Sequence, residues 1–181
     1  MWYAEIADLY DSLVQSDDDI PFFVERAGMT AGPVIELMAG TGRVSVPLLE
    51  RGIALTCVDA CPEMLAYLRA KIFACNLEAT LLCADVRRLD EHRWLRDSFA
   101  LGLIAFNSLS ELVEETDRVA ALRCARDCLV PGGELVCTLH NPVVRRRALA
   151  GAGPAAARRF SHPSGLGEVL FWLDAALDEV A

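Results

Sequence analysis

The chain has 181 residues, a net charge of −9 and a pI of about 4.8. An acidic chain without a basic stripe is a poor binder of nucleic acid, because that affinity comes mainly from Lys and Arg on phosphates. No apolar run approaches the roughly 20 residues that a membrane span needs, so we expect no membrane partner and a cytoplasmic location.

Hydrophobic residues make up 54% of the chain, which suits a parallel sheet buried on both faces. The seven cysteines are odd in number and include no C-x-x-C pair, so we interpret them as reduced core residues. Cys124 and Cys128 are one helical turn apart, but no nearby His completes a metal site. We therefore predict one domain, residues 1–181, without a metal.

The N-terminal pattern predicts two short helices, at residues 3–15 and 19–28, joined by an acidic segment. Ser16 or one of the Asp residues after it is a candidate N-cap of the second helix. The aromatic residues of this region can pack it onto the rest of the domain.

The stretch from Pro33 to Val44 organises the chain. A short apolar run, Val34 to Met38, is followed by Ala39-Gly40-Thr41-Gly42 and then by an amphipathic segment at residues 43–50. This order predicts a strand, a tight turn and a helix. Such glycines allow a ligand to approach the backbone near a helix N-terminus, although they also suit a plain sharp turn.

A second apolar run, residues 53–58, ends in Asp59, 17 positions after Gly42. An acid at the tip of this strand can accept both ribose hydroxyls of an adenosine. The dinucleotide fingerprint needs glycine at position 45, where this chain has Ser45. The pattern therefore disfavours a nicotinamide-dependent oxidoreductase.

Three further strands are predicted, at residues 79–84, 99–106 and 134–139. Asp85 ends the first of them and is also a candidate helix cap, while Asn107 ends the second and His140 the third. Helices are predicted from Pro62 and from Ser110 to about Leu129, a surface helix or loop at 90–98, and a turn at Pro131-Gly132-Gly133. Residues 142–157 look mobile or loosely helical, and extended segments are expected at 158–162 and 168–173.

In this order the motifs resemble those of the class I S-adenosylmethionine-dependent methyltransferases. The first motif stands as residues 36–42, with Met38 in place of its first glycine. The resemblance continues through Asp59, residues 83–86, 106–108 and 129–133, and covers roughly residues 3–142. It implies a Rossmann-like, doubly wound, mostly parallel α/β sheet. The parts would be a helical cap at 1–30, a cofactor-binding core at 31–142, and a truncated C-terminal segment at 143–181 with an incomplete strand pair.

The resemblance implies S-adenosylmethionine as the cofactor and S-adenosylhomocysteine as its product. Glu36 would orient the methionine end of the cofactor, Asp59 the ribose, and Asp85 the adenine. The cofactor-binding residues implied are Tyr10, Glu36, Met38, Ala39, Gly40, Thr41, Gly42, Arg43, Asp59, Ala60, Met64, Asp85, Val86 and Asn107. Met64 is equally suited to the core. Asn107 and His140 are candidates for the acceptor side of the reaction, although a His at this place is more often structural.

The leading hypothesis is methyl transfer to a small-molecule acceptor through an O, N or C nucleophile. The alternative is a non-catalytic S-adenosylmethionine-binding fold that acts as a partner or regulatory subunit. It is motivated by Met38 and by the short C-terminal region. Because the sequence predicts too few strands to close the sheet edge at the fifth strand, we also expect a homodimer in which residues 168–175 pack at the subunit boundary.

Overall fold

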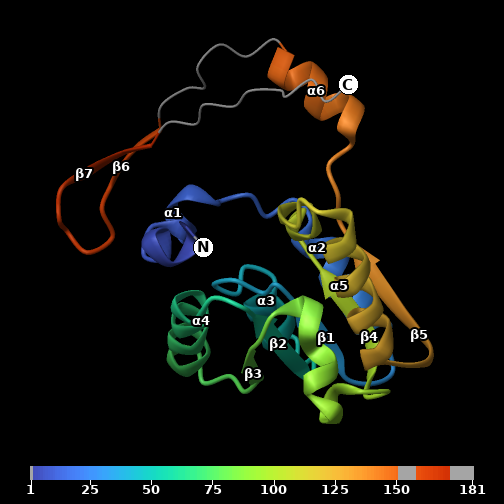
Figure 1. Cartoon of the computed structure of the whole chain (residues 1–181). Helices are drawn as coiled ribbons and strands as arrows, with labels where there is room; N and C mark the ends of the chain where they lie inside the picture. The colour runs from blue at the N-terminus through green and yellow to red at the C-terminus, as the bar shows by residue number, and fades with distance from the viewer. Residues whose placement is uncertain (1, 151–157, 172–181) are drawn as a thin grey trace. The chain divides into compact units, whose positions relative to one another are not determined.

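The computed structural model describes residues 2–150 and 158–171 of the chain (Figure 1). These residues belong to two compact units, Met1–Leu139 and His140–Ala181. The strands of the first unit are β1 (Val34–Leu37), β2 (Leu55–Asp59), β3 (Thr80–Cys83), β4 (Phe99–Ile104) and β5 (Leu129–Cys137). Its α-helices are α1 (Tyr10–Leu13), α2 (Ile20–Gly28), α3 (Ser45–Glu50), α4 (Pro62–Ala74) and α5 (Glu115–Cys128). Its 3-10 helices are η1 (Trp2–Ile6), η2 (Val86–Glu91), η3 (Arg93–Leu95) and η4 (Ser108–Glu111).

The five strands of the first unit form one sheet in the order β3-β2-β1-β4-β5, and all four pairings are parallel. β1 therefore lies at the centre, between β2 and β4 (Figure 1). This arrangement confirms the doubly wound parallel α/β fold predicted from the sequence. Because the strand order reverses beside β1, the carboxyl ends of β1 and β4 border the crevice where ligands bind in such sheets.

Both faces of the sheet are covered, which explains why its central strands are apolar at nearly every position. All four residues of β1 are buried. Leu101 and Leu103 pack on one face with apolar residues of α2, α3 and α4. Ile35 and Ile104 pack on the other face with residues of α5, η2 and η3. The result is a three-layer unit whose site residues stand at the rim of a rigid sheet.

The N-terminal region differs in detail from the prediction. The expected helix at residues 3–15 is two short pieces, η1 and α1. Asp19 is the residue before α2, but its side chain makes no capping hydrogen bond. Its carboxylate is instead occupied by the Arg43 guanidinium, an ion pair across 24 positions that a local pattern does not reveal.

The fifth strand begins earlier than predicted. The pairing with β4 runs from Phe99–Leu129 to Leu101–Glu134, so several residues of β5 are accommodated in an irregularity. The predicted turn at Pro131-Gly132-Gly133 is this irregularity, with Gly132 in the left-handed region at φ 83°. A proline without an N–H and a glycine at positive φ interrupt the ladder without ending the strand.

The second unit contains α6 (Pro142–Ala150), β6 (Arg158–Ser161) and β7 (Glu168–Phe171). β6 and β7 pair antiparallel as a two-stranded sheet of their own. They correspond to the two extended segments predicted from the sequence. Of the expected dimer segment 168–175, residues 172–175 lie outside the described residues.

No helix in the described part of the chain is long and apolar enough to cross a membrane.

Candidate functional site

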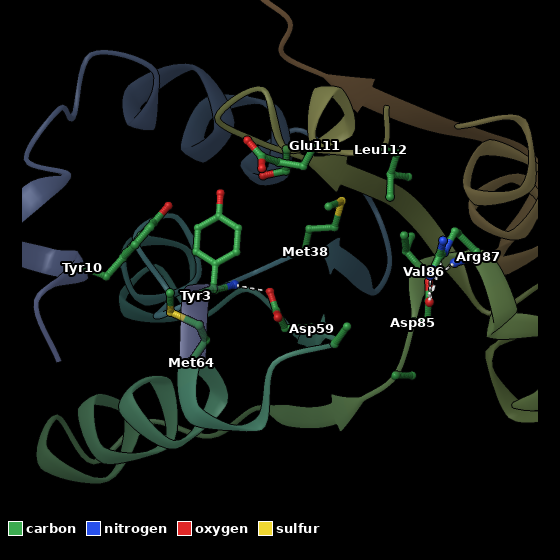
Figure 2. Close-up of a pocket in the computed structure, with 14 residues that line it drawn as sticks. Tyr3, Tyr10, Met38, Asp59, Met64, Asp85, Val86, Arg87, Glu111 and Leu112 are labelled. Atoms are coloured by element: carbon green, nitrogen blue, oxygen red, sulfur yellow. Dashed lines mark hydrogen bonds and ion pairs between the residues drawn. The ribbon is translucent and has the colours of Figure 1, made fainter. Parts of the chain in front are cut away.

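A cavity of about 290 Å³ opens beside the carboxyl ends of β1, β2 and β3. Figure 2 shows that its walls come from the N-terminal segment, the glycine turn, the start of α4 and the segments after β3 and β4. Its lining residues are Tyr3, Tyr10, Met38, Gly40, Asp59, Ala60, Met64, Ala84, Asp85, Val86, Arg87, Ser108, Glu111 and Leu112. The sheet thus brings together residues that are far apart in the sequence.

A second, smaller cavity of about 30 Å³ shares Tyr10, Met38, Gly40 and Ser108 with the first. Its other lining residues are Glu36, Ala39, Thr41, Arg43, Val44, Ala105 and Phe106. Between them the two cavities include twelve of the fourteen residues predicted to bind the cofactor. Gly42 and Asn107 line neither cavity, although Asn107 stands between the lining residues Phe106 and Ser108.

The turn after β1 has an unusual backbone. Met38, Gly40 and Gly42 all have positive φ, at 60°, 58° and 88°. A β-carbon on Gly40 would meet no atom within 4 Å, whereas one on Gly42 would come within 2.3 Å of Leu68 Cδ1. The space beside Gly40 is therefore open toward the cavities. At Gly42 the lack of a side chain allows α4 to pack against the turn. Met38 adopts the left-handed conformation that glycine would accept more easily.

Asp59 ties the tip of β2 to this turn. One carboxylate oxygen accepts the Gly40 N–H at 2.8 Å, and the other accepts the Cys61 N–H at 2.8 Å. Burial raises the pKa of Asp59, and these backbone bonds act in the opposite direction. A backbone hydrogen bond from Ala60 acts on the carboxylate as well, and Asp59 lines the main cavity.

Glu36 is a buried carboxyl group on β1, with 2% of its surface exposed. The Ser45 hydroxyl donates a hydrogen bond of 2.6 Å to it. Burial raises the pKa of Glu36 to about 7, partly offset by this hydrogen bond and by the nearby Arg43 charge. Ser45 stands where a dinucleotide-binding motif would need glycine. In this structure it is the hydrogen-bond partner of Glu36, the first acidic residue of the methyltransferase motif.

The N-terminal segment is fastened to the glycine turn by two polar clusters. In the first, the Thr41 hydroxyl donates to Asp11 at 2.7 Å, and Lys71 of α4 pairs with Asp11 at 2.6 Å. Lys71 also donates to the Thr41 carbonyl at 2.9 Å. This cluster holds α1 over the turn, where Tyr10 forms part of both cavities.

Arg43 forms the second cluster. Its guanidinium makes two hydrogen bonds with the Asp19 carboxylate, at 2.5 and 2.8 Å, and a third with the Ser16 carbonyl at 2.9 Å. It also stacks on the Phe106 ring, with 4.4 Å between the guanidinium carbon and the ring centroid. Arg43 therefore joins the N-terminal segment, the turn after β1 and the loop after β4.

Asp85 lines the main cavity and also caps η2, the alternative role considered from its sequence. Its carboxylate accepts the Arg87 N–H at 2.9 Å and pairs with the Arg87 guanidinium. These interactions hold the pKa of Asp85 below its ordinary value. A role toward an adenine amino group stays a prediction, because Arg87 already engages both carboxylate oxygens.

Several lining residues were not predicted, namely Tyr3, Ala84, Arg87, Ser108, Glu111 and Leu112. Tyr3 is one of the N-terminal aromatic residues for which packing onto the domain is one interpretation, and it also lines the cavity, with its ring centroid 6.0 Å from that of Tyr10. Ser108 follows the predicted Asn107 directly, so its place at the end of β4 could have been inferred. His140 belongs to the second unit, and its catalytic role stays a prediction.

These features can be compared with known proteins. A family model described as a methyltransferase domain matches residues 34–133, more than half of the 181 residues. The chain belongs to this methyltransferase family. The match spans β1, the glycine turn, Asp59 and the strands up to the start of β5, and so confirms the family resemblance.

Among curated proteins, the methyltransferase chain is similar to YqeM of Bacillus subtilis (strain 168), whose name marks it as a proposed methyltransferase. The two are 26% identical over 143 residues, which are 78% of this chain and 56% of YqeM. The chain thus spans little more than half the length of this relative.

Among solved structures, it is similar to the CcbJ methyltransferase from Streptomyces caelestis, with 28% identity and a TM-score of 0.68. That match covers 87% of this chain and 62% of CcbJ. The glycopeptide N-methyltransferase MtfA, crystallised with S-adenosylmethionine, is 26% identical with a TM-score of 0.58. It is matched over 86% of this chain and 64% of its own.

Proposed function

We propose that this protein binds S-adenosylmethionine in the two cavities and transfers its methyl group to a small-molecule acceptor. The observation that carries the proposal is the position of Asp59 in a methyltransferase domain. Its carboxylate stands at the tip of β2, bonded to the glycine turn and facing a cavity large enough for a nucleoside. S-adenosylhomocysteine would be the product.

The residues around the cavities fit this cofactor. Asp59 offers acceptors for two ribose hydroxyls, and Ala60, Met64 and Val86 offer apolar contacts for a purine ring. The smaller cavity contains the Glu36 carboxyl group and a turn with open space beside Gly40. A carboxyl group there suits the ammonium of the methionine end.

When bound, this cofactor supplies an electrophilic methyl group. The contribution of the chain is then mainly to hold the acceptor in line with it and to exclude water. Orientation of this kind can supply roughly 7–11 kcal/mol of the barrier. The walls formed by Tyr3, Tyr10 and Leu112 suit this task, since they are aromatic or apolar and line the cavity.

The role of Asp59 is tested by calorimetry with S-adenosylhomocysteine. Asp59→Ala should weaken binding at least about tenfold, because a hydrogen bond to a carboxylate is worth roughly 1.5–3 kcal/mol. The exposed Asp90→Ala variant is the control and should bind like the wild type. Equal affinity in Asp59→Ala and wild type would remove the basis of the proposal.

Methyl transfer itself is tested by incubating the protein with methyl-labelled S-adenosylmethionine and a pool of small metabolites. Label in a small molecule, detected by mass spectrometry, is expected for an enzyme. Cofactor binding without transfer of the label to any small molecule would favour the alternative, a non-catalytic binding subunit.

We also propose a cytoplasmic location and a homodimer, and both proposals rest on the sequence. Light scattering at micromolar concentration tests the dimer, and a monomer would refute it.

A further inference from the structure

Glu111 is a carboxylate of the main cavity whose charge has no cationic partner in the described part of the chain. It ends η4, the short helix after β4, and none of the ion pairs among the described residues includes it. The other two carboxylates of the cavity are already engaged. Asp59 accepts two backbone N–H groups, and Asp85 pairs with Arg87.

Glu111 faces an aromatic side chain across the cavity. Figure 2 shows the Tyr3 hydroxyl and the Glu111 carboxyl directed toward one another, with Met38 beside them. Burial raises the pKa of Tyr3 well above its ordinary 10.0, and the charge of Glu111 and a hydrogen bond with it act in the same direction. Tyr3 therefore stays a neutral phenol, and it leaves the negative charge of Glu111 uncompensated.

A carboxylate that has no cationic partner among the described residues and lies beside tyrosine rings is a suitable environment for an ammonium group. The carboxylate supplies a charge-assisted hydrogen bond, and the faces of Tyr3 and Tyr10 can attract a cation. Leu112 and Met38 provide apolar contacts for the remainder of such a molecule. A carboxylate acceptor would instead be repelled by Glu111 and by the net charge of −9.

We propose that the acceptor is a primary or secondary amine, which Glu111 binds and orients. This inference rests on the proposed methyl transfer. The bound ammonium loses one proton to solvent by way of the Glu111 carboxylate. The freed nitrogen lone pair then forms the C–N bond to the methyl group, and the electrons of the C–S bond remain on sulfur as a neutral thioether. The product is a methylated ammonium, so charge and atoms balance.

The experiment uses benzylamine as a cationic probe and benzyl alcohol as a neutral one of similar shape. Each is titrated at pH 7.5 by NMR into the full chain saturated with S-adenosylhomocysteine. Because Glu111 is solvent-exposed, the wild type should bind benzylamine about threefold more tightly than benzyl alcohol, the effect expected of an exposed ion pair. Glu111→Gln should lose this preference. Glu114→Gln, an exposed carboxylate three residues on that lines neither cavity, should keep it.

Calorimetry with S-adenosylhomocysteine on all three proteins separates this inference from the proposed function. If all bind it equally and only Glu111→Gln loses the preference for the amine, the inference is supported. If they bind it but the wild type does not distinguish the two probes, or Glu111→Gln distinguishes them equally well, the inference is refuted while cofactor binding stands. Failure of the wild type to bind S-adenosylhomocysteine would refute the proposed function itself and the inference with it.

Discussion

At the scale of single residues, Glu36 couples the stability of the fold to pH. Burial raises its pKa to about 7 from an ordinary 4.5. Between these two values the folded protein holds a proton that the unfolded chain has released. The unfolded state is therefore increasingly favoured as the pH rises, and the stabilising contribution is full below about 4.5 and lost above about 7.

Glu36→Gln should remove this dependence. Relative to the variant, the wild type should lose on the order of 3 kcal/mol of unfolding free energy between pH 4.5 and 7.5, since each unit of pKa corresponds to about 1.4 kcal/mol. Urea unfolding across this range measures the difference. Glu50→Gln, at an exposed carboxyl on α3, is the control and should follow the wild type. A constant difference between wild type and Glu36→Gln would contradict the buried, raised pKa.

The sequence predicts which residues stand at the strand tips, but not their backbone strain. Asp59 and Asp85 follow apolar runs, so their place at the carboxyl edge of a parallel sheet could be inferred. Met38, Phe106 and Asn107 adopt positive φ, at 60°, 51° and 62°. Asn adopts the left-handed region more readily than most residues, but nothing in the residue types of Met38 and Phe106 indicates it.

At the scale of elements, the N-terminal segment depends on polar contacts with the glycine turn. Arg43 is the main link, since its side chain is 14% exposed and contacts Asp19, Ser16 and Phe106. Lysine keeps the charge but cannot form the paired hydrogen bonds or the planar stack. The segment should then separate from the turn more readily than in the wild type.

Arg43→Lys should therefore lower the unfolding free energy by about 1–2 kcal/mol, a loss typical of hydrogen bonds to charged groups. Arg126→Lys is the matched control, because Arg126 also makes two hydrogen bonds to a carboxylate but is 72% exposed. It should change stability by less than about 0.5 kcal/mol. Equal effects of the two substitutions in urea unfolding would show that Arg43 is no more than a surface charge.

The hydrophobic pattern of this sequence predicts the order of its helices and strands, but it does not predict the polar contacts between them. The pairs Arg43–Asp19 and Tyr3–Glu111 join residues 24 and 108 positions apart, and no local period relates them. The turn predicted at residues 131–133 shows how a neighbouring strand can alter a prediction made from local sequence. Its local chemistry predicts a turn before the fifth strand, yet β4 pairs with residues on both sides of it, and it lies within β5 as an irregularity.

At the scale of the whole molecule, the first unit contains both cavities and the three apolar clusters of the described residues. A chain ending after Leu139 should therefore keep its far-UV circular dichroism per residue and its affinity for S-adenosylhomocysteine within about threefold. Calorimetry compares it with the full chain. Loss of binding with the fold retained would show that residues 140–181 contribute to the site.

The central claim is that a nucleoside cofactor lies against the turn after β1. Two glycines of the chain make this claim testable, because Gly40 and Gly52 both have positive φ, at 58° and 74°, and neither would bring a β-carbon within 4 Å of another atom. Alanine costs about 1–2 kcal/mol of backbone strain at either position. Gly40 lines both cavities and Gly52 lines neither.

The most direct measurement is the affinity of S-adenosylhomocysteine for the wild type, Gly40→Ala and Gly52→Ala, determined by calorimetry at one temperature. Both variants should lose similar thermal stability. Gly40→Ala should bind at least tenfold more weakly than the wild type, because its methyl group enters the space beside the turn, and Gly52→Ala should bind normally. Undiminished binding by a folded Gly40→Ala, or an equal loss in both variants, would contradict the account.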